Sequence, residues 1–209
     1  MEFITLKNDG KNTIKNISNS KYIVDFLSRN NLLISVANDL ITFGADSIIS
    51  LDKLGRENGT KKILEDKLNK KFIYDIGSQI LELKEENLGI TYFSLEDIVV
   101  INSSIFLFIN PKKIFHLLSR DEIKIERPVK SYTYGVIDSL SIKKDEPFIA
   151  PELLTKKSYI YYTTSFYSLA KMIINIFDME LDSLYYTSIY YFLKRCLEKI
   201  PEDRIFLYI

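Results

Sequence analysis

The sequence contains one cysteine, one histidine and no tryptophan among its 209 residues. Cys196 cannot form a disulfide within the chain, so we expect a reducing, intracellular compartment, either cytoplasmic or nuclear. Because Cys196 has helical spacing to Leu193 and Leu197, we expect it to pack in a core. His116 is the sole histidine, taken as a loop residue without a role. We therefore expect no paired-histidine metal site, no Ser-His-Asp site and no Cys-His site.

Net charge and long apolar runs are also lacking. Lys and Arg number 28 and Asp and Glu number 28, so no overall basic field favours nucleic acid, and we expect no nucleic-acid partner. The longest apolar stretch, Ile98–Ile109, is interrupted by Asn102, Ser103 and Ser104. Its β-branched residues favour strands over a membrane span. No charged segment followed by an apolar one opens the chain, and we expect neither a secretion signal nor a membrane partner.

Glycine and proline are scarce, with 7 and 5 residues, whereas 46% of the residues are hydrophobic. A chain of this length and composition can bury one sizeable core. The spacing of its apolar residues predicts both helices and short strands, and hence a mixed α+β fold. The expected elements are a brief strand within a polar loop over 1–20, a helix from Lys21 that stops at Asn30-Asn31, an antiparallel meander of Leu32–Val36, Leu40–Phe43 and Ser47–Leu51, a polar linker at Gly55–Gly59, two helices over 63–83 closed by Asn87-Leu88-Gly89, a hairpin of Ile98–Ile101 and Ile105–Ile109, a long connection over 110–147, and helices at Thr164–Phe177 and Ser188–Lys199.

Three short motifs follow one another towards the end of the chain. Ala150-Pro151-Glu152 comes first, Ser165–Ala170 (S-F-Y-S-L-A) second, and Arg195–Arg204 (R-C-L-E-K-I-P-E-D-R) last. In this order they resemble the lower half of a eukaryotic protein kinase, in which an A-P-E motif closes the activation segment. The resemblance implies that Glu152 and Arg204 form a buried or half-buried ion pair. Such a pair would support the architecture and take no part in chemistry.

The resemblance extends over about residues 20–209 and implies two lobes. Residues 1–54 would form a reduced N-lobe with a short strand, a helix and a small antiparallel sheet. Residues 55–209 would form a mainly helical C-lobe that lacks some late helices. Ser47–Leu54 is similar to the family's fifth strand and hinge, and Lys71–Gly89 to its long central helix. Lys7 is the candidate for the lysine that contacts the nucleotide phosphates, although no Gly-rich loop precedes it.

The residues that phosphoryl transfer requires are not found at the expected positions. The family uses one Asp as the base, and an Asn and a second Asp as ligands of Mg²⁺. Taking Asp97 as the metal-binding Asn puts Tyr92 at the position of the base, whereas counting from Gly89 puts Ser94 there. Neither side chain can act as that base. Asn110 occupies the position of the second Asp, and its uncharged amide is a poor ligand for Mg²⁺.

The hypothesis that follows is a truncated, degenerate kinase-like protein, a pseudokinase, that has no catalytic residue and binds or regulates a partner protein. An active kinase is the first candidate partner. We expect no cofactor and no metal; Mg-ATP, if it binds, would lie near Lys7, Asp97 and Asn110. The alternative is a divergent ATP-dependent Ser/Thr kinase that uses Glu96 or Asp97 as its acid. A third interpretation is a different α+β domain in which Ala150-Pro151-Glu152 occurs by chance.

Two groups of tyrosines lie around the last predicted helices. They could form a protein-binding face, because tyrosine is frequent at binding hot spots, or the core and rim of neighbouring helices. The sequence leaves both open. The residues are Tyr159, Tyr161, Tyr162, Tyr167, Tyr185, Tyr186, Tyr190 and Tyr191.

Overall fold

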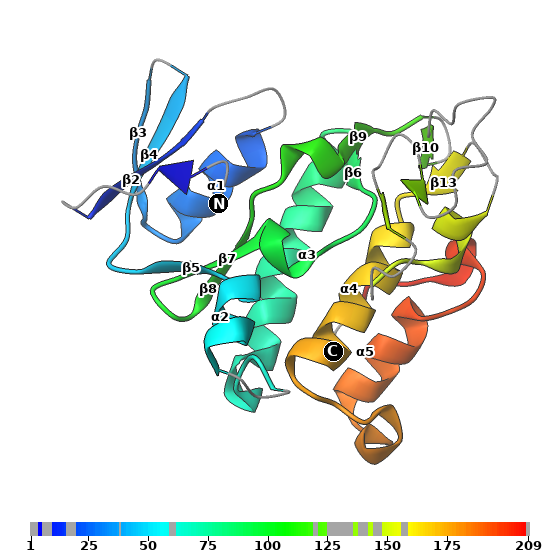
Figure 1. Cartoon of the computed structure of the whole chain (residues 1–209). Helices are drawn as coiled ribbons and strands as arrows, with labels where there is room; N and C mark the ends of the chain where they lie inside the picture. The colour runs from blue at the N-terminus through cyan, green and yellow to red at the C-terminus, as the bar shows by residue number, and fades with distance from the viewer. Residues whose placement is uncertain are drawn as a thin grey trace. The chain divides into compact units, whose positions relative to one another are not determined.

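The computed structural model describes residues 4–5, 10–15, 20–37, 39–58, 62–118, 121–124, 136–137, 142–143, 148–155 and 159–207. Helices and small sheets are both present, so the predicted α+β class is confirmed (Figure 1). Packing divides the chain into two compact units. Unit 1 comprises Met1–Leu83 and Leu95–Lys112, and unit 2 comprises Lys84–Ser94 and Lys113–Ile209.

A four-stranded antiparallel sheet and one helix form the first part of unit 1. The strand order is β1-β2-β4-β3, with β1 at Ile4–Thr5, β2 at Lys11–Lys15, β3 at Leu33–Ala37 and β4 at Leu40–Gly44. Helix α1, Lys21–Arg29, packs against β3 (Figure 1). It buries Tyr22, Ile23, Phe26 and Leu27, as the helical spacing predicted. Ser20 precedes the helix, but its side chain makes no capping hydrogen bond.

Two predictions for this region are wrong. Residues 11–15 were expected to be loop, yet they form β2, because pairing with β4 gives the polar strand its backbone partners and buries Asn12, Thr13 and Ile14. The third strand of the expected meander, β5 (Ile48–Ser50), pairs with β7 (Ile98–Ile101) in a different sheet. Asn102 fixes this arrangement, because its Oδ1 accepts hydrogen bonds from the backbone N–H groups of Asp46 and Ser47.

A second sheet of order β5-β7-β8 packs in unit 1 with two helices, α2 (Leu51–Asn58) and α3 (Asn69–Glu85). The hairpin of β7 and β8 (Ile105–Phe108) is the predicted one. The linker expected at Gly55–Gly59 is wrong, since α2 continues to Asn58. A Cβ on Gly55 would lie 3.1 Å from Cδ1 of Ile63, so close packing accounts for this glycine. The lobe boundary at residues 54 and 55 lies inside α2 and stays a prediction.

Of the two helices expected over 63–83, the structure contains one, α3, which begins only at Asn69. A short 3-10 turn, η1 (Asp66–Leu68), leads directly into α3. The predicted end of the region is confirmed, because α3 ends at Glu85 and Asn87 adopts a left-handed φ of 56°. Asparagine tolerates this conformation better than most residues, which explains its use after the helix.

Side chains from α1 and α3 satisfy the outer edge of β8. The Asp75 carboxylate accepts from the N–H of Phe106 at 3.0 Å, and Gln79 Nε2 donates to the carbonyl of Phe106 at 2.9 Å. Gln79 Oε1 accepts from the N–H of Phe108 at 2.9 Å, and the Tyr22 hydroxyl donates to the Phe108 carbonyl at 3.1 Å. These side chains supply the hydrogen bonds that a further strand would otherwise provide. Burial raises the pKa of Asp75, although Lys71 and Phe106 N–H act in the opposite direction.

In its described residues, unit 2 contains three pairs of short strands and two helices. The strand pairs are β6 (Leu88–Ile90) with β9 (Ile114–His116), β10 (Glu122–Lys124) with β13 (Tyr159–Tyr161), and β11 (Val136–Ile137) with β12 (Ile142–Lys143). The expected connection over 110–147 is thus interrupted by ordered elements, of which η3 (Pro111–Lys113) and β9 come first. His116, expected in a loop, is the exposed last residue of β9. A Cβ on Gly89 would lie 2.9 Å from Cδ2 of Leu117 and 3.1 Å from Cδ1 of Ile123, so a larger residue in β6 would have to displace the ends of these side chains.

The two late helices confirm their predicted positions and faces. Helix α4 is Thr164–Ile176 and α5 is Ser188–Cys196, and they pack against each other (Figure 1). Cys196 is buried in the core, as expected. Further 3-10 turns in the described residues are η2 (Leu95–Asp97) in unit 1 and η5 (Pro151–Leu154), η6 (Leu181–Leu184) and η7 (Pro201–Asp203) in unit 2. Within the described ranges, no helix has both the length and the apolar character needed to cross a bilayer.

Candidate functional site

The residues singled out in the sequence fall into three groups, which we describe separately. Asp97 and Asn110 belong to unit 1, at the two ends of the β7–β8 hairpin. Tyr92 and Ser94 belong to unit 2. The Ala150-Pro151-Glu152 motif and Arg204 form the third group, also in unit 2. Lys7 lies outside the described residues.

Asp97 and Asn110 are in direct contact. Asn110 Nδ2 donates to Asp97 Oδ1 at 2.7 Å, and the backbone N–H of Ile109 donates to the Asp97 carbonyl at 2.9 Å. The side-chain oxygen of Asn110 accepts from the N–H of Lys112 at 3.1 Å. Asp97 is 1% exposed. The hairpin therefore brings together two residues that are 13 positions apart in the sequence.

The charge of Asp97 acts on a neighbouring tyrosine. Burial, and secondarily the carboxylate of Asp97, raises the pKa of Tyr22 far above its ordinary value. The phenol is thus held in its neutral form, in which it can donate to the carbonyl of Phe108. Asp97, Tyr22 and the end of β8 form a polar cluster inside unit 1.

As a cation site, the Asp97–Asn110 pair is poorly arranged. Mg²⁺ and Ca²⁺ prefer several oxygen ligands, with carboxylates foremost. Asn110 turns its amide N–H₂ towards Asp97 and its oxygen towards Lys112, so its oxygen does not face the cation that Asp97 would hold. Over the described part of the chain, no group of three or more His, Cys, Asp or Glu side chains is arranged so that it could hold a metal ion.

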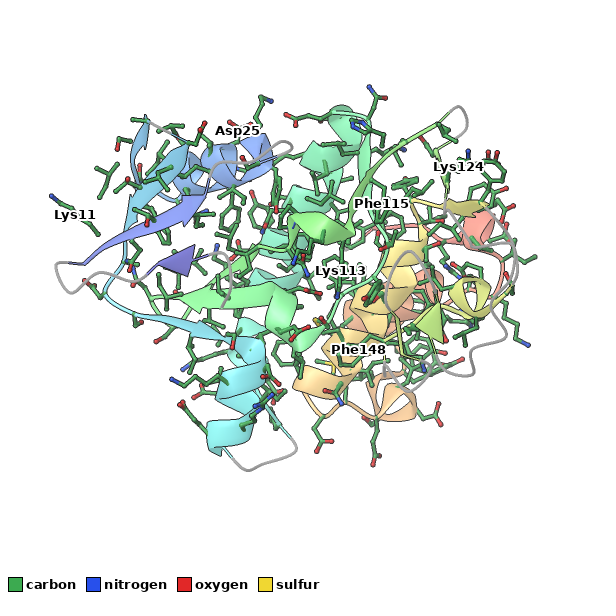
Figure 2. All side chains as sticks on the ribbon, turned by 45° about the horizontal axis from the view of Figure 1, so that its top comes forward. Lys11, Asp25, Lys113, Phe115, Lys124 and Phe148 are labelled. Carbon is green, nitrogen blue, oxygen red and sulfur yellow. The ribbon has the colours of Figure 1, made fainter. Side chains whose placement is uncertain are left out.

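In unit 2, Tyr92 and Ser94 surround one buried lysine. Lys113 Nζ donates to Ser94 Oγ at 2.9 Å and lies 3.8 Å from the centroid of the Tyr92 ring. Lys113 directly precedes β9, two residues before Phe115 (Figure 2). All three side chains are buried. Both positions that the resemblance assigns to the catalytic base are therefore occupied by groups that bind an ammonium, through a ring face and a hydroxyl.

The backbone around these residues is held by α4. Ser168 Oγ accepts from the N–H of Phe93 at 2.8 Å, and Thr91 N–H donates to the carbonyl of Lys113 at 3.3 Å, which continues the β6–β9 pairing. Tyr92 also packs in a core cluster with Ile123 and Ile160. The segment is thus built into the core of unit 2.

Sequence reasoning missed Lys113. The available signal was local: Lys113 immediately precedes the apolar residues of a strand, Ile114 and Phe115, where a charged side chain is buried by its neighbours. Only the pairing of β9 with β6 shows which groups would receive its ammonium.

Glu152 and Arg204 form the ion pair that the sequence predicted. Arg204 donates from Nη1 to Glu152 Oε1 at 2.5 Å and from Nη2 to Oε2 at 2.9 Å. Thr164 Oγ1 donates to the same carboxylate at 2.8 Å, and Arg204 Nε donates to the carbonyl of Glu198 at 2.8 Å. Two parallel hydrogen bonds between a guanidinium and a carboxylate are among the strongest polar contacts in proteins.

The pair joins four segments of unit 2. Glu152 comes from η5, which begins at Pro151; Thr164 is the first residue of α4; and Arg204 follows η7. The Tyr167 ring lies 5.0 Å below the guanidinium carbon of Arg204. Burial raises the pKa of the Tyr167 phenol, with the charge of Arg204 acting in the opposite direction. The Glu152–Arg204 contact therefore has a structural role, since the carboxylate and the guanidinium both hydrogen-bond to groups of unit 2.

Comparison of the chain with protein-family models gives no match, and no curated protein is significantly similar to it in sequence.

Proposed function

We propose that the chain is a catalytically inactive, kinase-like protein that works by binding a partner protein and regulating it, with an active protein kinase as the first candidate. The observation that carries the proposal of inactivity is the environment of Tyr92 and Ser94. Phosphoryl transfer needs a carboxylate to accept the proton of the substrate hydroxyl. The two candidate positions instead hold an aromatic ring and a hydroxyl, both in contact with the ammonium of Lys113.

Three features support the kinase-like part of the proposal. The Glu152–Arg204 pair links the A-P-E motif to the end of the chain, as the resemblance implies. The order of α3, the β7–β8 hairpin, the motif and α4 is also the order that the resemblance implies. Asp97 and Asn110 touch each other, which is consistent with two ligands of a former metal site.

A nucleotide titration tests the inactive state. A ligand present at about 100 times its Kd stabilises a protein by about 2.7 kcal/mol, which raises the Tm of a chain of this length by about 5 to 10 °C. We expect no such shift with Mg-ATP and no incorporation of γ-phosphate into the chain or into a generic substrate. A shift that is lost in Asp97→Ala would contradict the proposal in this form.

The binding role needs a defined partner. Chemical crosslinking followed by mass spectrometry identifies candidate proteins, and each candidate is then purified and titrated with the chain. We expect one of them to bind reversibly and, if it is a kinase, to change its activity in proportion to the fraction bound. The proposal fails if the purified candidates neither bind nor change activity.

The alternative function is a divergent kinase that uses Glu96 or Asp97. Glu96 is the exposed middle residue of the η2 turn, which favours it as an accessible acid. Phosphoryl transfer that survives Asp97→Asn but is lost in Glu96→Gln would support this alternative. The reverse pattern would assign the role to Asp97.

A further inference from the structure

Four tyrosines of unit 2 form a continuous array between α4 and α5. The ring centroid of Tyr185 lies 4.3 Å from that of Tyr186 and 4.9 Å from that of Tyr190, and Tyr190 lies 5.3 Å from Tyr191. All three contacts are edge-to-face, the geometry that aromatic pairs favour. Tyr190 is 9% exposed, whereas Tyr185, Tyr186 and Tyr191 are 54%, 80% and 42% exposed. The buried Tyr190 ring therefore contacts the exposed rings of Tyr185 and Tyr191, and Tyr186 joins the array through Tyr185.

Local backbone contacts hold the array in place. Thr187 caps α5, because its Oγ1 accepts from the N–H of Tyr190 at 3.2 Å and donates to the carbonyl of Leu184 at 2.6 Å. Tyr186 adopts a φ of 67°, a left-handed conformation that costs energy for any residue with a Cβ. A large apolar side chain held exposed in a strained conformation is a feature found at functional sites.

The segment that leads into the array is acidic. Residues 172–193 contain Asp178, Glu180 and Asp182 and no Lys, Arg or His. These carboxylates are exposed and precede or lie in η6, which packs against α5 (Figure 1, the orange loop between α4 and α5). Carboxylates and aromatic ring faces both attract cations. Lys194 already illustrates this within the chain, since its ammonium lies 5.8 Å from the centroid of the Tyr190 ring.

We propose that this surface, the tyrosine–acid patch of Tyr185, Tyr186, Tyr191, Asp178, Glu180 and Asp182, binds a segment of a partner protein rich in Lys and Arg. Guanidinium and ammonium groups stack on the exposed rings and pair with the carboxylates. The charge of the patch repels nucleic acids and anionic membranes, and its preordered rings lower the entropic cost of binding. The inference rests on the proposed binding role and gives the chemistry of the partner.

Titration with a labelled peptide tests this inference. The probe is a fluorescein-labelled peptide in which Lys and Arg alternate with Gly and Ser. In the control peptide, Gln replaces each Lys and citrulline replaces each Arg. Fluorescence anisotropy should show binding of the basic peptide alone. We expect Tyr186→Ala to raise Kd by about 5- to 10-fold and Tyr185→Phe to leave it unchanged, because the ring face makes the contact. The double change Glu180→Gln and Asp182→Asn should weaken binding and reduce its salt dependence.

Matched variants elsewhere in the chain provide the controls. Tyr74 on α3 is 70% exposed and has Lys71 above its ring, so Tyr74→Ala removes a comparable tyrosine outside the patch. Glu202→Gln removes an exposed carboxylate from η7. Neither should change Kd. The proposal is overturned if Tyr186→Ala and Tyr74→Ala have equal effects, or if the uncharged peptide binds as well as the basic one.

Self-association is a separate outcome. If sedimentation equilibrium shows a dimer that Tyr186→Ala disrupts while the basic peptide does not bind, the occupant is a second copy of this chain and the proposal is wrong. Transfer of phosphate from Mg-ATP to the peptide would instead contradict the inactive state. Because peptide binding is measured without nucleotide, a failure of the patch and a failure of the proposed inactivity give different results.

Discussion

Cys196 is a thiol whose ionisation the fold opposes. Its Sγ lies 3.7 Å from the carbonyl of Ile205, and burial raises the pKa of the thiol from 9.0 to about 12, despite the opposing charges of Arg204 and Arg195. A group whose pKa is higher in the folded state stabilises the fold fully below its unfolded pKa, and this stabilisation is lost as the pH rises towards the folded pKa.

The stability difference between wild type and Cys196→Ala should therefore depend on pH only in alkaline solution. We expect it to be constant up to about pH 9 and to fall by at most about 1.4 kcal/mol per pH unit above that. Urea unfolding at a series of pH values measures it. Parallel stability curves between pH 9 and pH 11 would contradict the prediction.

Tyr186 allows backbone strain to be separated from side-chain contacts. Its φ of 67° is accessible to glycine without penalty but costs other residues about 1 kcal/mol or more. Since both substitutions remove the ring, Tyr186→Gly should be more stable than Tyr186→Ala by about 1 kcal/mol. Thermal unfolding of the two variants compares them directly. An alanine variant at least as stable as the glycine variant would show that the segment relaxes.

For single residues, the sequence predicted a contact between two recognisable motifs, and it missed a contact that depends on how two strands pair. The Glu152–Arg204 contact could be predicted because the resemblance to the kinase family implies a pair at these two positions, and the structure contains it. The contacts of Lys113 could not be predicted, because Tyr92 and Ser94 lie about 20 residues earlier, in the segment after β6, and only the β6–β9 register brings them to Lys113.

Strand β8 depends on a helix for the hydrogen bonds of its outer edge. Gln79 serves both the carbonyl of Phe106 and the N–H of Phe108. Replacing it by leucine leaves two buried backbone groups without their partner, so Gln79→Leu should cost about 2 to 4 kcal/mol of unfolding free energy. Hydrogen exchange at the Phe108 amide should become faster in the same variant.

The control for this prediction lies on the other face of α3. Leu81 is exposed, and Leu81→Ala should change the stability by less than about 0.5 kcal/mol and leave exchange at Phe108 unchanged. If Gln79→Leu is as mild as Leu81→Ala, the side chain of Gln79 does not contribute to the strand edge.

Among the elements, those with a strong apolar period were predicted well. Helices α1, α4 and α5 and the β7–β8 hairpin all carry their pattern in consecutive residues. Strand β2 was missed because its residues are polar and its burial comes from β4, 25 or more residues later. Helix α2 was missed because Gly55 resembles a hinge, whereas its missing side chain makes room for Ile63.

At the scale of the whole molecule, the Glu152–Arg204 pair is the predicted contact with the largest separation in sequence. We expect it to contribute to the stability of unit 2. Removing one partner of a buried ion pair leaves the other charge without compensation and costs about 3 to 5 kcal/mol. We expect this loss for Glu152→Gln and for Arg204→Met. The double variant should lose less than the sum of the two, as denaturant unfolding of all four proteins would show.

An exposed pair in unit 1 is the matched control. On α2, Arg56 Nη2 lies 2.7 Å from Asp52 Oδ2, and the Arg56 side chain is largely exposed to solvent. Arg56→Gln should therefore cost less than about 0.5 kcal/mol. A loss in Glu152→Gln as small as that would mean that the predicted link between the motif and the end of the chain is not needed for the fold.

The division into two units was beyond reach of the sequence for a physical reason. Residues 84–94 leave unit 1 and residues 95–112 return to it, so neither unit is one continuous stretch of chain. Composition and spacing reveal boundaries where the chain passes once between domains. This chain passes between the two units three times, so its composition and spacing do not mark the boundaries.

The contact between α3 and β8 has a consequence for how this sequence can change in evolution. One helical turn from Asp75 to Gln79 advances about 6 Å, and two strand residues from Phe106 to Phe108 advance about 6.6 Å. The spacing of Asp75 and Gln79 along the helix therefore matches the spacing of Phe106 and Phe108 along the strand edge. A single insertion or deletion between residues 75 and 79 would rotate one partner away by about 100°. Length variation among descendants of this chain should thus be absent here, with Asp75 and Gln79 inherited together.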